Sequence, residues 1–171
     1  MHLRSTFLLT LAAAVLTSCS AVRSELPLTA IAPNPDRELE AALKFIEKAP
    51  DSAAGYRQLA VLYIKRARET GDFSLNRKAE DAVSRALSVT PNDEASLKLR
   101  ASLHLTFHRF AEGLELGNRL AKDYPDDSLV YGILTDANAQ LGNYPAAVAA
   151  AQKAVDLKPN SNSYARVAYL R

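Results

Sequence analysis

Four similar tripeptides divide the chain at regular intervals. Each consists of a proline, then Asp or Asn, then Asp or Ser, and they begin at Pro50, Pro91, Pro125 and Pro159. Counted along the sequence, the intervals between these prolines are 41, 34 and 34. Proline cannot lie in a helix interior, and the residues that follow it are good helix N-caps. Each tripeptide therefore predicts the end of one helix and the start of the next, in a chain of repeated helical units.

The composition agrees with an all-α chain. Apolar residues make up 48% of the 171 residues, and most of them are alanine and leucine. These two residues favour helices, whereas the β-branched residues that favour strands are few. A β-sandwich, a barrel and a Val/Ile-rich parallel sheet are therefore disfavoured, and the length suits one domain with a sizeable core.

The best-formed unit lies between the last two tripeptides. A first helix is expected from about Ser128 to Leu141, a turn at 142–144, and a second helix from about Ala146 to Leu157. The tetratricopeptide family carries a large aromatic residue, two packing alanines and a terminal proline at fixed positions of its repeat. The residues at these positions here are Tyr131, Ala147, Ala154 and Pro159. The chain resembles this family, whose repeat length equals the spacing of the last three prolines. The resemblance implies an all-α, right-handed superhelical solenoid of antiparallel helix pairs.

The resemblance covers residues 36–171, with about three full repeats and a partial repeat at each end. The full repeats are expected at about 52–91, 92–125 and 126–159. The first of them has seven extra residues, which we expect to add about one helical turn and a longer loop through 71–73.

The two ends of this region predict unpaired helices. Residues 37–49 form a lone helix, either the second helix of a degenerate repeat or a cap. Residues 160–171 form a partial repeat with an uncovered apolar face made of Tyr164, Val167, Ala168 and Leu170. A solenoid end normally carries a polar cap. We therefore expect either that the natural chain continues past Arg171, or that the protein associates with another subunit through this helix.

Residues 1–18 predict a bacterial lipoprotein signal. Residues 7–16 are an apolar run too short to span a bilayer, as in a secretory signal. The sequence Leu16-Thr17-Ser18-Cys19 resembles the lipobox, which implies cleavage before Cys19 and acylation of that residue. The alternative is an ordinary signal peptide cut after Ala21. Residues 19–35 would follow as a flexible tether, and the absence of Asp after Cys19 implies an outer-membrane anchor facing the periplasm.

The charge balance and the motifs argue against nucleic-acid binding, a metal site and catalysis. Lys and Arg number 21 and Asp and Glu 19, a net charge of +2 that becomes +1 when Arg4 leaves with the signal. Nothing in this balance calls for a nucleic-acid partner. His104 and His108 are spaced as metal ligands on a helix, but no third ligand lies near them, so we expect a packing and a turn histidine. The pairs at 93–94 and 126–127 are expected to cap helices. We expect no catalytic residue, cofactor or metal, and no enzyme activity.

The resemblance also implies a binding surface. In the family, the first helix of each repeat lines a concave groove, and its positions here are Arg57, Val61, Ile64, Lys65, Lys98, Ser102, Leu105, Gly132, Asp136, Ala139 and Gln140. Arg57 and Lys98 occupy equivalent positions and are expected to be available to a partner's carboxylate. One subgroup clamps a carboxylate with asparagines, but Val61, Ser102 and Asp136 stand at those positions here, which argues against that clamp.

The expected function is therefore that of a non-enzymatic, lipid-anchored scaffold. Its concave groove would bind a peptide or helix of a partner protein. Proteins of similar build serve pilus assembly, outer-membrane protein assembly or the recruitment of peptidoglycan enzymes, and the sequence does not choose among these processes. The alternative is an N-terminal recognition arm of a longer envelope enzyme whose catalytic domain lies beyond residue 171.

Overall fold

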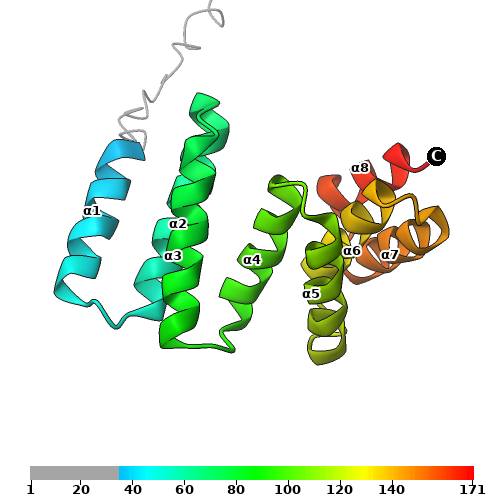
Figure 1. Cartoon of the computed structure of the whole chain (residues 1–171). Coiled ribbons are helices and arrows are strands. Elements are labelled where there is room, and N and C mark those ends of the chain that lie inside the picture. Colours follow the sequence, from blue (N-terminus) through cyan, green and yellow to red (C-terminus); the bar gives the residue numbers. More distant parts are fainter. Residues whose placement is uncertain (1–34) are drawn as a thin grey trace, which may run out of the picture. The chain divides into compact units, whose positions relative to one another are not determined.

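The computed structural model describes residues 35–171, which form eight α-helices and no strand (Figure 1). The helices are α1 (Pro35–Lys48), α2 (Ala53–Thr70), α3 (Ser74–Val89), α4 (Glu94–Thr106), α5 (Phe110–Asp123), α6 (Ser128–Gln140), α7 (Tyr144–Leu157) and α8 (Ser161–Tyr169). The expected signal, Cys19 and the tether as far as residue 34 lie outside the described residues. Within residues 35–171, no helix is both long and apolar enough to cross a bilayer.

The helices stack as pairs. α2 packs with α3, α4 with α5, and α6 with α7, and the first helix of each pair also contacts the first helix of the next: α2 with α4, α4 with α6, and α6 with α8. The second helices α3, α5 and α7 make no contact with one another. Because the first helices are closer together than the second helices, the stack curves with the first helices on its inner side.

The tripeptides supply the N-caps of the first helices. The side chains of Ser52, Asp93 and Asp127 each accept a hydrogen bond from a backbone N–H in the first turn, which confirms the expected capping. The fourth N-cap differs, because the middle residue Asn160 caps α8 in a reciprocal arrangement with Ser163. The N-caps of α4 and α6 are Asp93 and Asp127, and the same spacing would put the N-cap of α8 at Ser161. The observed N-cap, Asn160, therefore lies one position earlier.

The seven extra residues of the first full repeat lengthen both of its helices. α2 has 18 residues against 13 in α4 and α6, and α3 has 16 against 14 in α5 and α7, which accounts for five and two residues. The loop at 71–73 is as short as the loops at 107–109 and 141–143. The prediction of a longer loop is therefore wrong. When residues are added to a helix, their backbone amides and carbonyls form hydrogen bonds within that helix. In a longer loop, these groups would be left to solvent.

One helix start also differs from the expectation. α7 begins at Tyr144, two residues before the predicted start at Ala146. Pro145 fits this first turn, because the amide that proline lacks has no partner there in any case.

Small side chains separate the paired helices. Ala60 of α2 and Ala79 of α3 are completely buried in one core cluster, Ala86 of α3 is also completely buried, and Ala101 is completely buried between α4 and its neighbours. At Gly117 of α5 the approach is so close that a Cβ atom would lie 2.9 Å from a methyl carbon of Leu134. Small residues thus allow the helix axes to come together, and the first helices are held in place to form the inner surface.

Candidate partner-binding groove

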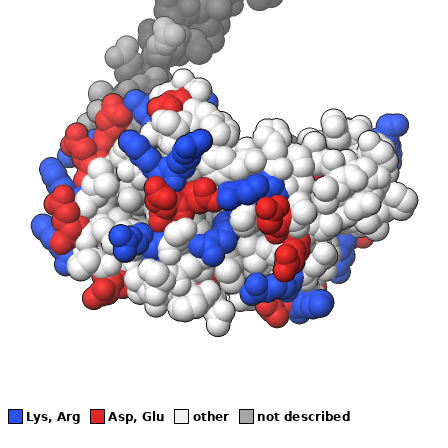
Figure 2. All heavy atoms as spheres, in the orientation of Figure 1, with Lys and Arg blue, Asp and Glu red and all other residues white. Residues whose placement is uncertain are grey.

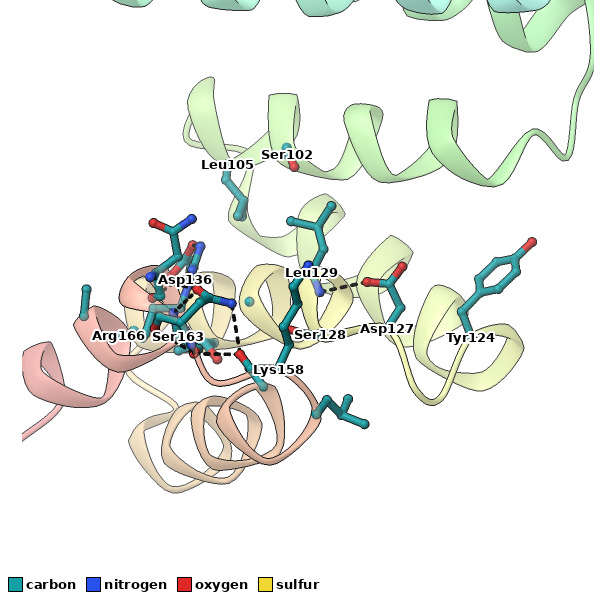
Figure 3. A pocket seen from close by; sticks show the side chains of 18 of the residues that line it. Ser102, Leu105, Tyr124, Asp127, Ser128, Leu129, Asp136, Lys158, Ser163 and Arg166 are labelled. Carbon is teal, nitrogen blue, oxygen red and sulfur yellow. Dashed lines mark hydrogen bonds and ion pairs between the residues drawn. The ribbon is translucent and has the colours of Figure 1, made fainter. Parts of the chain in front are cut away.

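A groove with a volume of about 1270 Å³ lies along the inner side of α4, α6 and α8. Its lining combines small polar and aliphatic side chains with a few charges. In Figure 3, Ser102 and Leu105 of α4 lie across the groove from Leu129 and Asp136 of α6. Leu129 is 51% exposed, so the groove offers uncovered apolar surface to a ligand.

Six of the eleven residues expected to bind a partner line this groove, four of them being Ser102, Leu105, Asp136 and Gln140. Gly132 and Ala139 line it as well. The remaining five lie outside it: Arg57, Val61, Ile64, Lys65 and Lys98. Among these, Ile64 packs against the core beneath α2, and Lys65 pairs with Glu38 of α1 at 3.3 Å. The groove therefore belongs to the second half of the stack.

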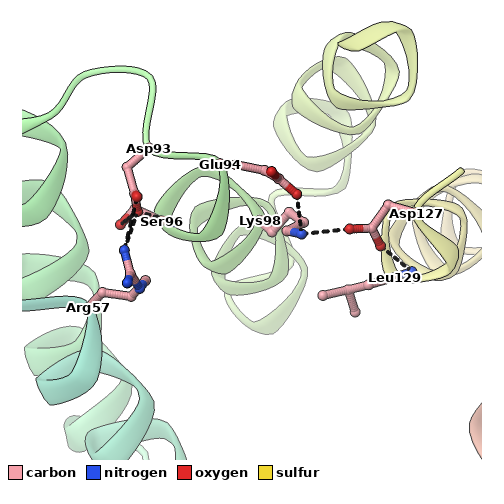
Figure 4. A network of polar contacts seen from close by, with 7 residues as sticks. All are labelled: Arg57, Asp93, Glu94, Ser96, Lys98, Asp127 and Leu129. Carbon is pink, nitrogen blue, oxygen red and sulfur yellow. Dashed lines mark hydrogen bonds and ion pairs between the residues drawn. The ribbon is translucent and has the colours of Figure 1, made fainter. Parts of the chain in front are cut away.

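Arg57 is engaged within the chain. Its guanidinium donates hydrogen bonds of 2.9 Å to both carboxylate oxygens of Asp93, the N-cap of α4 (Figure 4). Asp93 also accepts a hydrogen bond from the hydroxyl of Ser96. Burial alone raises the pKa of Asp93, but the bonds from Ser96 and Arg57 outweigh it, so this pKa lies below its usual range.

Lys98 repeats this arrangement one repeat later. Its ammonium lies 2.6 Å from Asp127, the N-cap of α6, and 2.6 Å from Glu94 in its own helix (Figure 4). Burial lowers the pKa of Lys98, but its hydrogen bonds to Asp127 and Glu94 outweigh burial, and the pKa is raised. In the same way the bonds to Asp127 outweigh its burial, and the pKa of Asp127 is lowered.

The two cations therefore act between repeats. In each case a cation on one first helix binds the aspartate that caps the next first helix. We call Arg57–Asp93 and Lys98–Asp127 the inter-repeat braces. The expectation that Arg57 and Lys98 are available to a partner's carboxylate is thereby revised, because each already holds a carboxylate of its own chain.

The third repeat has no cation at the equivalent position. Gly132 stands there, and the guanidinium of Arg166 from α8 covers it, so that a Cβ on Gly132 would lie 3.2 Å from the guanidinium carbon. Arg166 donates two hydrogen bonds, of 2.8 and 2.7 Å, to the two carboxylate oxygens of Asp136. This bidentate pair joins α6 to α8 at the floor of the groove.

The histidines and the acidic pairs have the following surroundings in the helix stack. His104 packs partly buried on α4, and burial lowers its pKa, with the neighbouring Arg109 adding to the effect. His108 lies in the loop before α5 with a left-handed backbone (φ 57°). Asp93 and Asp127 cap helices. Within residues 35–171 there is no group of three or more His, Cys, Asp or Glu residues that is placed to hold a metal ion.

The lining residues that were not anticipated from the sequence include Leu129, Arg166 and Tyr169. Leu129 has a local signal, since it is a large apolar residue in the first turn of α6 that lies outside the buried stripe of the helix. Arg166 and Tyr169 belong to α8, whose shifted N-cap at Asn160 changes which residues face inward.

Charges on the surface are mixed. Figure 2 shows acidic and basic side chains side by side over the part of the surface that α1 to α5 form, and fewer charges where α6, α7 and α8 form the surface. A continuous basic stripe, which nucleic-acid binding requires, is not seen on this face.

Comparison with known proteins identifies the fold. No family model matches the sequence, and no curated protein matches it at a significant level. Among solved structures, TTC0263, a thermophilic TPR protein of Thermus thermophilus, superposes with a TM-score of 0.66 at 17% identity, over 80% of this chain and 72% of that one. The chain therefore has the tetratricopeptide-repeat fold.

Two further structures agree with this assignment. MamA 41-end from Desulfovibrio magneticus RS-1 gives a TM-score of 0.65 at 17% identity, over 81% of this chain and 75% of that one. The MamA RS-1 ArsTM double mutant gives 0.64 at 18% identity, over 80% and 73%. The expected all-α solenoid is confirmed, and at these identities the likeness concerns the fold alone.

Proposed function

We propose that this chain is a non-enzymatic, lipid-anchored scaffold that binds a peptide or a helix of a partner protein in the groove between α4, α6 and α8. The observation that carries the proposal is the groove itself, an open surface of about 1270 Å³ held on the inner side of a rigid helix stack. A preformed surface of this kind binds an extended segment without paying for its own ordering.

The partner segment is defined by what the groove presents. Leu105, Leu129 and Ala139 offer apolar surface, and Ser102 and Gln140 offer hydrogen-bonding groups. The other lining residues include charges of both signs, Arg68 and Lys158 with Glu94, Asp126 and Asp127, and at the floor Asp136 and Arg166 neutralise each other. The ligand that fits best is therefore an amphipathic segment with aliphatic and uncharged polar side chains, rather than a strongly acidic peptide or a free carboxylate.

A matched pair of substitutions tests the groove. Leu129→Lys places a charge in it, whereas Val148→Lys places the same charge on α7, at a residue 50% exposed that does not line the groove. Both proteins are used to capture partners from the envelope fraction of the source cells. We expect Leu129→Lys to lose the partners and Val148→Lys to keep them. Equal recovery with both variants would exclude the groove as the binding surface.

Anchoring is the second part of the proposal. The lipobox-like sequence before Cys19 supports acylation of that residue, and the tether would then hold the helix stack at the periplasmic face of the outer membrane. The envelope processes in which such a scaffold would serve are pilus or outer-membrane assembly. Cys19→Ala should move the protein out of the membrane fraction or leave it unprocessed. Acyl labelling that is the same in the variant and the wild type would refute the anchor and leave the groove proposal standing.

A further inference from the structure

Helix α1 occupies the place of a second helix, and among the described residues 35–171 no first helix is paired with it. Its inward residues are found by counting back from the next N-cap: the equivalents of Ala79, Ala82 and Ala86 in α3 are Glu38, Ala41 and Phe45 in α1. All three alanines of α3 are buried, and Ala79 and Ala82 belong to one core cluster with Leu59 and Ala60 of α2. In α1, by contrast, Ala41 is exposed and Phe45 is 52% exposed.

These uncovered residues form a second groove, with a volume of about 500 Å³. Its lining is mainly apolar and includes Glu38, Ala41, Ala42 and Phe45 from α1 with Gly55 and Leu62 from α2. Inside the stack, the space between a second helix and the next first helix is filled by the first helix of the same repeat. For example, α4 packs against both α5 and α6 and fills the space between them. The groove between α1 and α2 is therefore shaped for the first helix of a repeat, and residues 35–171 leave it open.

Helix α8 differs in the opposite way: it occupies the place of a first helix, and no second helix lies beside it within residues 35–171. Counting from the N-caps, Tyr164 and Ala168 of α8 are equivalent to Tyr131 and Thr135 of α6. Thr135 is only 2% exposed, and Lys153 of α7 lies over the Tyr131 ring, 5.8 Å from its centroid. In α8, Tyr164 is 56% exposed and Ala168 is exposed too. No helix of residues 35–171 covers this side of α8.

One charged contact is available between the two ends. α8 contains no acidic residue, and α1 contains four acidic and three basic residues in PDRELEAALKFIEK, of which Glu38 lines the groove and forms an exposed pair with Lys65 at 3.3 Å. Arg171 is the equivalent of His104, whose Cβ would lie 3.6 Å from a Cβ on Gly113. Because Glu38 is the equivalent of Gly113, placing α8 against α1 as a helix pair brings Arg171 beside Glu38.

We infer that two copies of this chain associate head to tail, with α8 of one copy entering the groove between α1 and α2 of the next. α8 of one copy, as the first helix, and α1 of the next, as the second helix, then make a complete repeat. α1 and α8 make no contact within one chain and lie at opposite ends of the stack (Figure 1), so the pairing joins separate copies. Such a heterologous contact leaves a free groove and a free α8, and assembly continues into a chain or a ring.

The test uses two blocking substitutions on exposed alanines. Ala41→Arg obstructs the groove and Ala168→Arg obstructs α8, while Ala149→Arg on α7 is a matched control at an exposed alanine outside both surfaces. The full chain is studied in a density-matched detergent by sedimentation velocity over a concentration series. Far-UV circular dichroism shows that each variant is folded.

The wild type and Ala149→Arg are expected to grow beyond dimers as concentration rises. Each blocking variant alone is expected to associate at least ten-fold more weakly and to remain monomeric. A mixture of Ala41→Arg and Ala168→Arg should form dimers and stop there, because only one compatible pair of ends remains. A monomeric wild type overturns the inference, as does a mixture that stays monomeric or assembly that either block leaves unchanged.

Discussion

The inter-repeat brace between Lys98 and Asp127 should contribute measurably to stability, because Asp127 has two roles at once. Its carboxylate accepts a hydrogen bond of 2.8 Å from the backbone N–H of Leu129 and one of 2.6 Å from the ammonium of Lys98. Asp127→Ala removes both. Asp127→Asn removes the negative charge and leaves a side chain that caps a helix equally well.

The size of each effect follows from exposure. Loss of an N-cap costs about 1 kcal/mol. The Lys98 and Asp127 side chains are 16% and 24% exposed, so their pair lies between a surface pair, worth under about 1 kcal/mol, and a buried one, and we assign it roughly 1–2 kcal/mol. Asp127→Ala should therefore destabilise the fold by about 2–3 kcal/mol and Asp127→Asn by about 1–2 kcal/mol.

Urea unfolding followed by far-UV circular dichroism measures both values. Asp126→Asn is the control, since Asp126 is exposed in the same turn and is expected to change stability by less than about 0.5 kcal/mol. The Asp127 pKa is lowered from 3.8, so the brace is at full strength above that pH and is lost as the pH falls through the lower native value. The wild type should therefore lose more stability than Asp127→Asn on acidification. If Asp127→Asn and the wild type have the same urea unfolding midpoint at neutral pH, the brace does not stabilise the stack.

Three further predictions concern the two braces, His104 and Gly142. The Arg57→Glu/Lys98→Glu double variant places like charges together at both braces and should lose about 3 kcal/mol or more in urea unfolding, and a fold as stable as the wild type would contradict the pairing. His104→Asn should flatten the pH dependence of the melting temperature: burial lowers the His104 pKa from 6.5, so the wild type loses stability as the pH falls below that value, and the check is a melting series from neutral to acidic pH. Gly142→Ala should cost about 1 kcal/mol, because Gly142 has φ 77°, and an unchanged unfolding midpoint would show that the loop adapts.

The sequence predicted the helix pairs because their signals are local. Pro91 and Pro125 end helices wherever they stand, and Asp93 and Asp127 cap the helices that follow. The equal spacing of the last three tripeptides then specifies the stack. The seven-residue insertion was misjudged in detail, since both α2 and α3 have sequences that continue a helix, and nothing local distinguishes a longer helix from a longer loop.

The groove could be predicted only in part, because its electrostatics depend on contacts between repeats. Arg57 and Asp93 are 36 residues apart, and Arg166 and Asp136 are 30 apart. A signal for the first kind of contact was present, namely a cation on a first helix with an aspartate at the next N-cap, repeated in Lys98 and Asp127. The second depends on the one-residue shift of the N-cap at Asn160, which the proline spacing does not reveal.

The central claim, that a partner segment lies in the groove of α4, α6 and α8, is tested most directly by site-specific photo-crosslinking in the source cells. A photoreactive amino acid is placed at Ser102 or Gln140, on opposite sides of the groove, or at Val148 on α7 as a control. The account predicts a crosslink to the same partner from both groove positions and none from Val148. Crosslinks to that partner from Val148 alone, or equally from all three positions, would contradict it.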